Sequence, residues 1–253
     1  MSGAEGIRVR GLCKAFGEQV VLDGIDLDIP RGEQRVILGK SGQGKSVLLK
    51  LMVGLLHADA GSVEVDGTEV IGLSRRRLFQ LRRRFGMVFQ GGALFDSLTV
   101  GENVGLGLRE HTDLSDAEVA RRAREALAQV GLDDSYHKRP AELSGGMKKR
   151  ASLARAIVTT PDYILYDEPT TGLDPISADA INRLIRRLQD ELGVTSIVVT
   201  HDMTSAFHVG ERFALLNGGR MVFEGTAEEA RAATEGPIHQ FIEGSSVGPL
   251  DAF

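Results

Sequence analysis

The chain has 253 residues, of which 42% are apolar and 26% are charged, and its formal net charge is −5. This composition is that of a globular protein with a substantial core, and the acidic balance argues against nucleic acid as a partner. One cysteine, Cys13, excludes an internal disulfide framework. No stretch approaches the roughly 18 apolar residues of a membrane-spanning helix, and the N-terminus has no signal-peptide core. We therefore expect a cytoplasmic chain whose membrane role, if any, comes through a partner.

The N-terminal third is predicted to form strands. Residues 24–33, GIDLDIPRGE, alternate apolar and acidic side chains, which is typical of a half-buried strand ending near Pro30. Residues 35–39, RVILG, form a short apolar run that leads directly into glycine. Residues 61–70, GSVEVDGTEV, place Asp66 and Gly67 between two alternating segments, which predicts a β-hairpin.

The middle of the chain changes to helical spacing and then alternates between strands and helices. Residues 115–130 open on Ser115 and predict a helix, whereas the apolar segments 163–167 and 195–200 enclose a helical segment at 176–192. This alternation predicts an α/β fold: a mostly parallel sheet core with an N-terminal antiparallel β subdomain and an inserted α-helical subdomain. We expect a single domain over 1–253. Its parts are a core at 1–96 and 156–235, a helical subdomain at 97–155 and a C-terminal tail at 236–253 that extends toward a partner subunit.

Residues 39–46, GKSGQGKS, match the phosphate-loop pattern between an apolar strand and a helix. Glycines let successive backbone N–H groups converge on phosphate oxygens, and a helix N-terminus adds a favourable dipole. Lys45 is predicted to reach the β- and γ-phosphates, and the Ser46 hydroxyl to ligate Mg²⁺. The alternative is a structural glycine turn. The predicted nucleotide contacts are Gly39, Lys40, Ser41, Gly42, Gln43, Gly44, Lys45, Ser46 and Val47.

A second group of candidate residues ends two other apolar strands. In YILYDEP, residues 163–169, Asp167 is predicted to hold Mg²⁺ and Glu168 to act as the general base on the attacking water. The alternative is that both carboxylates cap a strand at the surface. His201 follows the apolar run 197–200 and is predicted to contact the γ-phosphate, the alternative being a structural histidine.

Taken together, these motifs occur in a fixed order along the chain. The order is GKSGQGKS, MVFQGGALF, LSGGM at 143–147, YILYDEP, TTGLD at 170–174, and then His201. It resembles the nucleotide-binding subunits of ABC transporters over nearly the whole length. The resemblance implies the P-loop NTPase fold of ABC ATPases, ATP as the ligand and ATP hydrolysis as the activity.

The resemblance also assigns roles that the separate motifs do not. Phe16 would stack on adenine, the alternative being an ordinary core residue, and Gln90 would contact Mg²⁺ or the attacking water. Ser144, Gly145 and Gly146 would bind the ATP held by a second subunit. Asp174 would cross the same interface. The chain is therefore expected to act as a homodimer with two shared ATP sites.

Three longer segments are similar to the ATPases of MCE-associated lipid transporters of the Mla type, which move phospholipids between inner and outer membranes. These are GMVFQGGALFDSLTVGENV, LSGGMKKRASLARAI and YDEPTTGLDPI. Met147 and Thr171 depart from the commonest ABC sequences, which have glutamine and serine there, without removing a phosphate-binding group. The resemblance implies a permease, an MCE-domain protein and a location at the cytoplasmic face of the inner membrane. Residues 90–99, with Phe95, would receive the permease's coupling helix.

Two other functions stay open at this point. An importer ATPase for amino acids or metals would differ only in its partner, and a non-transport ABC ATPase acting in assembly or repair would have no permease. The arginine run at 75–84 has three interpretations: a solvated helix face, attraction to anionic lipid headgroups and, least favoured in an acidic chain, nucleic-acid binding.

Overall fold

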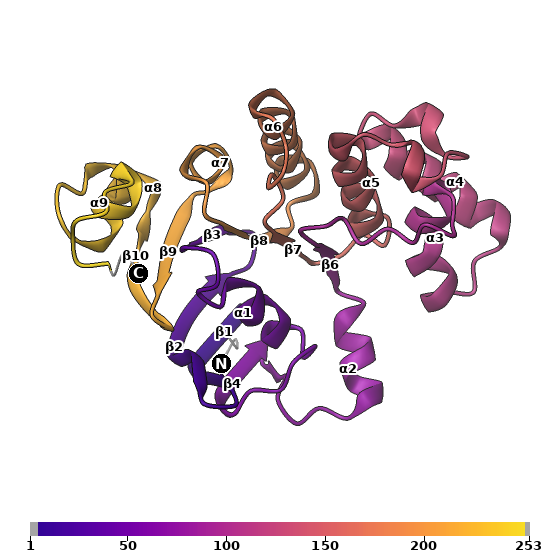
Figure 1. Ribbon diagram of the computed structural model, residues 1–253. Coiled ribbons are helices and arrows are strands. Elements are labelled where there is room, and N and C mark those ends of the chain that lie inside the picture. The colour runs from indigo at the N-terminus through magenta and orange to yellow at the C-terminus, as the bar shows by residue number, and fades with distance from the viewer. Residues whose placement is uncertain (1–4, 251–253) are drawn as a thin grey trace. The chain divides into compact units, whose positions relative to one another are not determined.

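The computed structural model describes residues 5–250 (Figure 1). The chain divides into two compact units. The first unit consists of Met1–Gln80 and Thr195–Phe253, and the second of Leu81–Val194. The second unit is larger than the helical subdomain predicted at 97–155, because it also contains two strands and a further helix. Within residues 5–250, no helix has the length and apolar character needed to span a bilayer.

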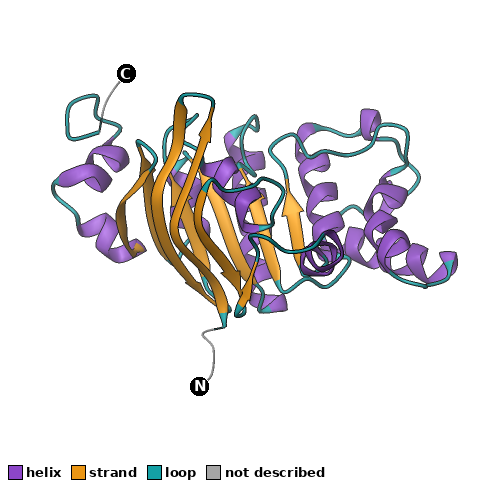
Figure 2. Cartoon of the chain, turned by 90° about the horizontal axis from the view of Figure 1, so that it is seen from below, coloured by secondary structure: helices purple, strands orange, loops and turns teal. Residues whose placement is uncertain are grey.

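The first unit contains a four-stranded antiparallel sheet in the order β2-β1-β4-β5 (Figure 2). Its strands are β1 (Gly6–Phe16), β2 (Gln19–Pro30), β4 (Ala60–Val65) and β5 (Thr68–Glu69). The apolar side chains at 25, 27 and 29 are buried and the two aspartates between them are exposed, as the alternation predicts. Asp66 and Gly67 have φ angles of 47° and 74°, the left-handed conformations that a two-residue hairpin turn requires. The predicted antiparallel β portion is confirmed.

The same unit holds the strands β10-β9-β3-β8 as neighbours. They are β3 (Gln34–Leu38), β8 (Thr195–Thr200), β9 (Arg212–Asn217) and β10 (Arg220–Thr226). β3 pairs in parallel with both β8 and β9, and every residue of β3 and β8 is buried. Continuous burial is what a parallel strand covered on both faces requires. The parallel sheet core, which was predicted from the alternation of strands and helices, is confirmed.

Short helices accompany these strands: α1 (Lys45–Met52), α7 (Met203–Val209), α8 (Ala227–Ala232) and α9 (Gly236–Glu243). α8 and α9 lie beside β10 (Figure 1). The described part of the predicted C-terminal tail packs on its own unit, since α9 contacts β10 and α8. Within the tail, the Leu250 amide donates to Oε1 of Gln240 at 2.6 Å. Residues 251–253 of that predicted tail lie outside the described residues.

The second unit pairs β6 (Phe85–Val88) in parallel with β7 (Tyr163–Asp167). Its helices are α3 (Val100–His111), α4 (Asp116–Gln129), α5 (Gly145–Ile157) and α6 (Pro175–Leu192), with short 3-10 turns at Asp133–Ser135 and Pro140–Glu142. Helix α4 confirms the helix predicted at 115–130: Ser115 caps it by accepting from the Glu118 amide, and the predicted apolar positions are buried. α3, α4 and α5 pack together.

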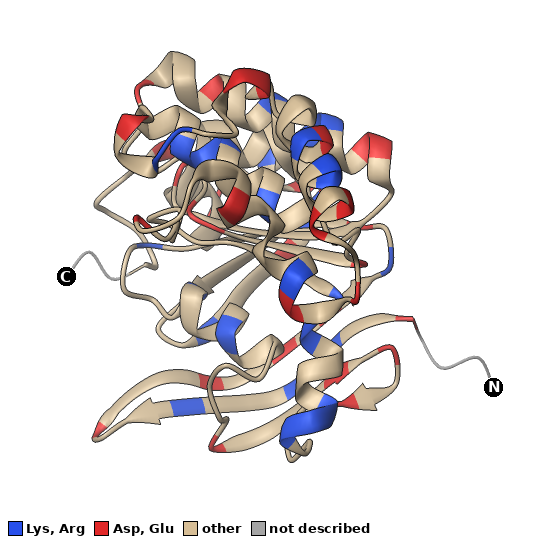
Figure 3. Ribbon diagram, turned by 90° about the vertical axis from the view of Figure 1, so that its right-hand side faces the viewer, with Lys and Arg blue, Asp and Glu red and all other residues tan. Residues whose placement is uncertain are grey.

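Charged residues of both signs are interspersed along the helices (Figure 3). On α4, Glu118 pairs with both Arg121 and Arg122, and α6 carries further pairs one turn apart. The arginine run forms helix α2 (Arg75–Arg82), whose first three arginines are exposed. This exposure agrees with the first of the three interpretations, a solvated helix face, and attraction to anionic lipid headgroups stays a prediction.

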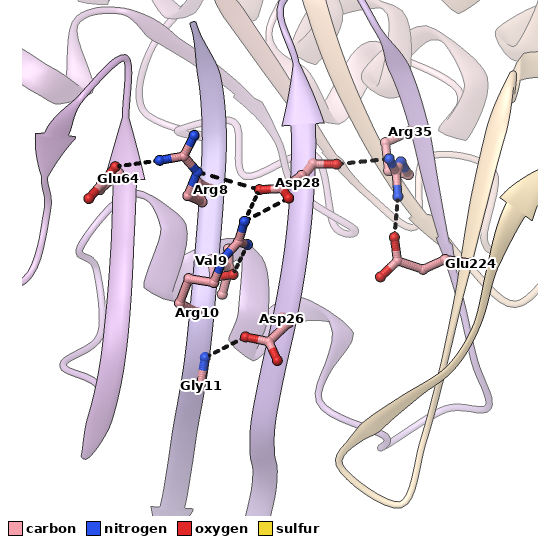
Figure 4. Close-up of polar contacts among 9 residues, drawn as sticks. All are labelled: Arg8, Val9, Arg10, Gly11, Asp26, Asp28, Arg35, Glu64 and Glu224. Atoms are coloured by element: carbon pink, nitrogen blue, oxygen red, sulfur yellow. Dashed lines mark hydrogen bonds and ion pairs between the residues drawn. The ribbon is translucent and has the colours of Figure 1, made fainter. Parts of the chain in front are cut away.

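Arg35 is a buried cation that joins the two sheets of the first unit. It is 3% exposed, and its guanidinium donates to Glu33 at 2.6 Å. It also donates to Glu224 at 3.1 Å and to the Asp28 carbonyl at 2.8 Å (Figure 4). Arg10, by contrast, forms an exposed ion pair with the Asp28 carboxylate (Figure 4).

We expect Arg35→Met to lower the free energy of unfolding by about 3 kcal/mol, because it removes the buried guanidinium and leaves the partly buried Glu33 carboxylate and the Asp28 carbonyl without this donor. Arg10→Met is the matched control and should cost about 1 kcal/mol or less, since exposed ion pairs contribute little. Chemical denaturation of the two variants measures both changes. Equal losses would show that Arg35 contributes no more than a surface pair.

Candidate nucleotide-binding and catalytic sites

The phosphate loop leaves the end of β3 and enters α1 along a path that only glycine accommodates. Gly39 has φ 154°, and a Cβ there would lie 2.5 Å from the Leu216 carbonyl oxygen. Gly44, at the N-cap of α1, has φ 92°, and a Cβ would meet Val21 at 2.8 Å. Both conformations are costly for residues with a side chain. The glycine spacing in GKSGQGKS is thus required by the backbone path itself.

Lys45 is held within this loop. Its Nζ donates to the carbonyl oxygens of Gly39 at 2.6 Å and Lys40 at 2.9 Å, and the side chain is buried. The Gln43 side chain accepts from the Gly218 amide at 2.8 Å, which ties the outer part of the loop to the β9–β10 turn. The first turn of α1 contains no acidic residue, so the positive end of the helix dipole is not neutralised. This arrangement suits a phosphate group.

The remaining predicted contacts of the first unit are Phe16 and His201. Phe16 ends β1 and is 48% exposed, with the Lys14 ammonium 5.2 Å from its ring centroid. It is therefore not the core residue that the alternative interpretation required. His201 follows the last residue of β8 and is exposed. Both side chains are accessible to a ligand.

In the second unit, Asp167 is the last residue of β7 and Glu168 follows it; both are buried. Burial argues against the alternative that these carboxylates only cap a strand at the surface. Glu168 is 7% exposed and has φ 50°, an unusual conformation for a non-glycine residue. The Thr171 hydroxyl donates to its Oε2 at 3.0 Å. Such conformations concentrate at functional sites, and here one fixes the direction of the carboxylate.

Lys149 is a residue of this site that the sequence analysis missed. It is 6% exposed, and its Nζ donates to the carbonyl oxygen of Glu168 at 3.2 Å and to that of Gln90. In the sequence it belongs to a run of positive charge after the signature glycines. A helix starting at Gly145 places position 149 on the same side as positions 152 and 156, which are buried. This helical periodicity could have identified Lys149 as a buried residue.

The signature residues form the N-terminus of α5. Ser144 is the N-cap and its Oγ accepts from the Met147 amide at 3.3 Å, while Gly145 and Gly146 open the helix. Ser144 and Gly145 are exposed, and the first turn has no acidic residue. An exposed helix N-terminus of this kind favours an anion. The signature motif thus lies at the entrance to a helix.

Asp174 caps the neighbouring helix α6. Its Oδ1 accepts from the amides of Ile176 at 3.1 Å and Ser177 at 3.0 Å. Hydrogen bonds from Ser177 lower the pKa of the Asp174 carboxyl, so that it remains ionised at neutral pH. A cavity of about 550 Å³ is bordered by Ser177 on this helix and by Ser144 on α5. The structure thus gives Asp174 a local capping role besides the one predicted at an interface.

The predicted metal ligands Ser46, Gln90 and Asp167 offer a hydroxyl, an amide and a carboxylate. Within residues 5–250, no group of three or more histidine, cysteine, aspartate or glutamate side chains is placed to hold a metal by itself. Ser46 belongs to the first unit, and Gln90 and Asp167 belong to the second. Each offers an oxygen donor, which is the kind of ligand that Mg²⁺ takes besides water and substrate phosphates.

Comparisons with known proteins agree with these features. Residues 22–171 match the ABC transporter family. Over 244 residues the chain is 41% identical to the probable ribonucleotide transport ATP-binding protein mkl of Mycobacterium leprae, covering 96% of this chain and 70% of that protein. It is 40% identical to the intermembrane phospholipid transport system ATP-binding protein MlaF of Haemophilus influenzae, covering 96% and 92%.

A solved structure, the dimeric ATP-binding cassette MJ0796 bound to ADP and Pi after hydrolysis, has a TM-score of 0.80 and 34% identity to this chain, covering 87% of it and 98% of the cassette. The four-stranded antiparallel sheet and the parallel strands therefore form the fold of an ABC ATPase. The chain belongs to the ABC transporter family and is its ATP-binding, ATP-hydrolysing cassette.

Proposed function

We propose that this ABC ATPase powers phospholipid transport between the inner and outer membranes, together with a permease and an MCE-domain protein. The observation that carries the proposal is the 40% identity to a phospholipid transport ATPase over 92% of that protein's length. The relative named for ribonucleotide transport is matched over 70% of its length. Ribonucleotide transport is accordingly the second candidate function.

In the proposed mechanism the residues of the chain divide the work of hydrolysis. Phe16 would stack on adenine, the loop amides and Lys45 would hold the phosphates, and His201 would contact the γ-phosphate. Glu168 would accept the proton of the attacking water. Ser46, Gln90 and Asp167 would hold Mg²⁺, which neutralises phosphate charge. Positioning and charge stabilisation then account for most of the catalysis.

The proposal includes a homodimer with two shared ATP sites. The signature helix presents Ser144 and Gly145 at an exposed N-terminus, and a dimeric cassette is among the similar solved structures. Ser144, Gly145 and Gly146 would bind the γ-phosphate held by the partner's loop, and Asp174 would lie at the same interface.

The permease would dock on the second unit, at the cytoplasmic face of the inner membrane. A cavity of about 330 Å³ is lined by Phe89, Ala93 and Phe95, and Phe95 is 54% exposed. An exposed aromatic ring beside an open cavity is what a docking helix needs as an anchor. This agrees with the role predicted for residues 90–99.

Affinity purification of the chain from its native membrane, with mass spectrometry of the accompanying proteins and lipids, tests the proposal. We expect a permease, an MCE-domain protein and bound phospholipid. Copurification of a permease without an MCE-domain protein or phospholipid would contradict the lipid assignment and favour ribonucleotides or another imported substrate. Isolation of the chain without any membrane protein would favour a role in assembly or repair.

A further inference from the structure

Helix α5 holds the segment Gln90–Ala93 through three side chains. Lys149 donates to the carbonyl oxygen at the start of the segment, and the Ser152 hydroxyl donates to the Gly92 carbonyl at 2.7 Å. Arg155 donates to the carbonyls of the last two residues at 2.9 and 2.6 Å. These three side chains are spaced three residues apart and so project from the same part of the helix surface. The backbone that carries the Gln90 side chain is thus fixed by α5.

Lys149 also reaches Glu168, the residue that follows β7. Its Nζ donates to the Glu168 carbonyl oxygen at 3.2 Å, where the backbone has φ 50°. An ammonium has three donors in one compact group, so a single side chain can bind both carbonyls. Burial lowers the pKa of the Lys149 ammonium, whereas the charges of Glu168 and Asp167 raise it.

We propose that Lys149 is a positioning residue for hydrolysis, which fixes the backbone of Gln90 and of Glu168 relative to each other from the signature helix. This inference rests on the proposed role of Glu168 as the general base. Glu168 and Gln90 are the two residues assigned to the attacking water, and displacing such groups by about 1 Å can slow a reaction roughly 100-fold. Ser144 caps the same helix, so α5 both presents the signature motif and holds the backbone of Gln90 and Glu168.

A purely structural role for Lys149 makes a different prediction. A buried lysine that only stabilises the fold would, on replacement, lower the melting temperature, and the folded fraction would keep its turnover number. A positioning role lowers kcat per folded, nucleotide-bound molecule while the affinity for nucleotide stays the same. The two roles are therefore separated by kcat, nucleotide affinity and thermal unfolding measured on the same preparation.

The test is Lys149→Met in the full chain, with Lys148→Met as the matched control. Both changes remove one positive charge from adjacent positions of α5, and in the described part of the chain no hydrogen bond joins the Lys148 side chain to residues 90–93 or 168. We expect Lys149→Met to lower kcat for Mg·ATP by roughly 10- to 100-fold, with nucleotide affinity within about threefold. Lys148→Met should stay within about twofold of the unmodified chain. Lys149→Gln, which retains N–H donors, should recover part of the loss.

A double-mutant cycle with Glu168→Gln completes the test. If Lys149 acts through Glu168, adding Lys149→Met to Glu168→Gln should lower the residual hydrolysis by less than about threefold, since residues that act as a unit are not additive. Full additivity, or a kcat of Lys149→Met equal to that of Lys148→Met, would overturn the inference. Should Lys149→Met not fold, Lys149→Gln carries the same cycle. Near-normal turnover of Glu168→Gln alone would instead remove the general-base assignment on which the inference rests.

Discussion

Replacement of Glu168 by glutamine is expected to slow ATP hydrolysis by roughly 10²- to 10⁴-fold while ATP binding persists. Glutamine has nearly the same shape and can still accept the hydrogen bond that Thr171 donates to Oε2 at 3.0 Å, so the local structure should be retained. What it lacks is the basicity to take a proton from the attacking water. Single-turnover hydrolysis and equilibrium binding of a fluorescent ATP analogue measure the two properties separately.

Glu125→Gln is the matched control for this change. Glu125 is an exposed carboxylate of α4 that pairs with Arg121, and its replacement should leave turnover within about twofold. The variant at position 168 should also accumulate as an ATP-bound dimer, because hydrolysis no longer removes the nucleotide that joins the subunits. Turnover close to that of the control would show that another group accepts the proton.

Much of the fold could be predicted because the local sequence patterns agree with the strands, turns and helices that form. The alternation at 24–30 gave the correct exposed and buried faces of β2, and Asp66-Gly67 gave the hairpin turn. The helix after the phosphate loop ends earlier than the mostly apolar segment 46–56, SVLLKLMVGLL, which favours a helix throughout. α1 ends at Met52 because Gly54, two residues later, has φ 63°. A glycine in this left-handed conformation is a common helix end.

The sequence identifies candidate site residues, which remain predictions, but it does not identify the contacts that support them. Motif order identifies Glu168, Gln90 and Ser144, because each motif is contiguous in sequence. The hydrogen bonds from Lys149 join positions 59 and 19 residues away, and no local pattern encodes such a separation. The left-handed backbone conformation of Glu168 could not be predicted from the sequence either, because its neighbours are typical of an ordinary strand end. Tertiary packing decides both.

The second large effect concerns the phosphate loop. Lys45→Ala is expected to weaken ATP binding roughly 10- to 100-fold, because it removes a charge-assisted hydrogen bond to phosphate. Lys50→Ala, in the last turn of the same helix, is the control and should bind ATP normally. Ser144→Arg should leave the loop of its own chain intact and block the signature surface instead, since a bulky side chain would occupy the helix N-terminus. Neither homodimer, of Lys45→Ala or of Ser144→Arg, should hydrolyse ATP at more than a few per cent of the normal rate.

Mixing these two inactive chains shows whether the signature motif acts on its own chain's nucleotide or on the partner's. If the signature motif acts on the partner's nucleotide, one site of the mixed dimer combines the Lys45→Ala loop with the Ser144→Arg signature and carries both defects. The other site combines the intact loop of the Ser144→Arg chain with the intact signature of the Lys45→Ala chain. Hydrolysis should therefore return on mixing, up to one working site per mixed dimer. If Ser144 served its own chain, every site would retain one defect and mixing would restore nothing. Two working sites per mixed dimer would be incompatible with either arrangement.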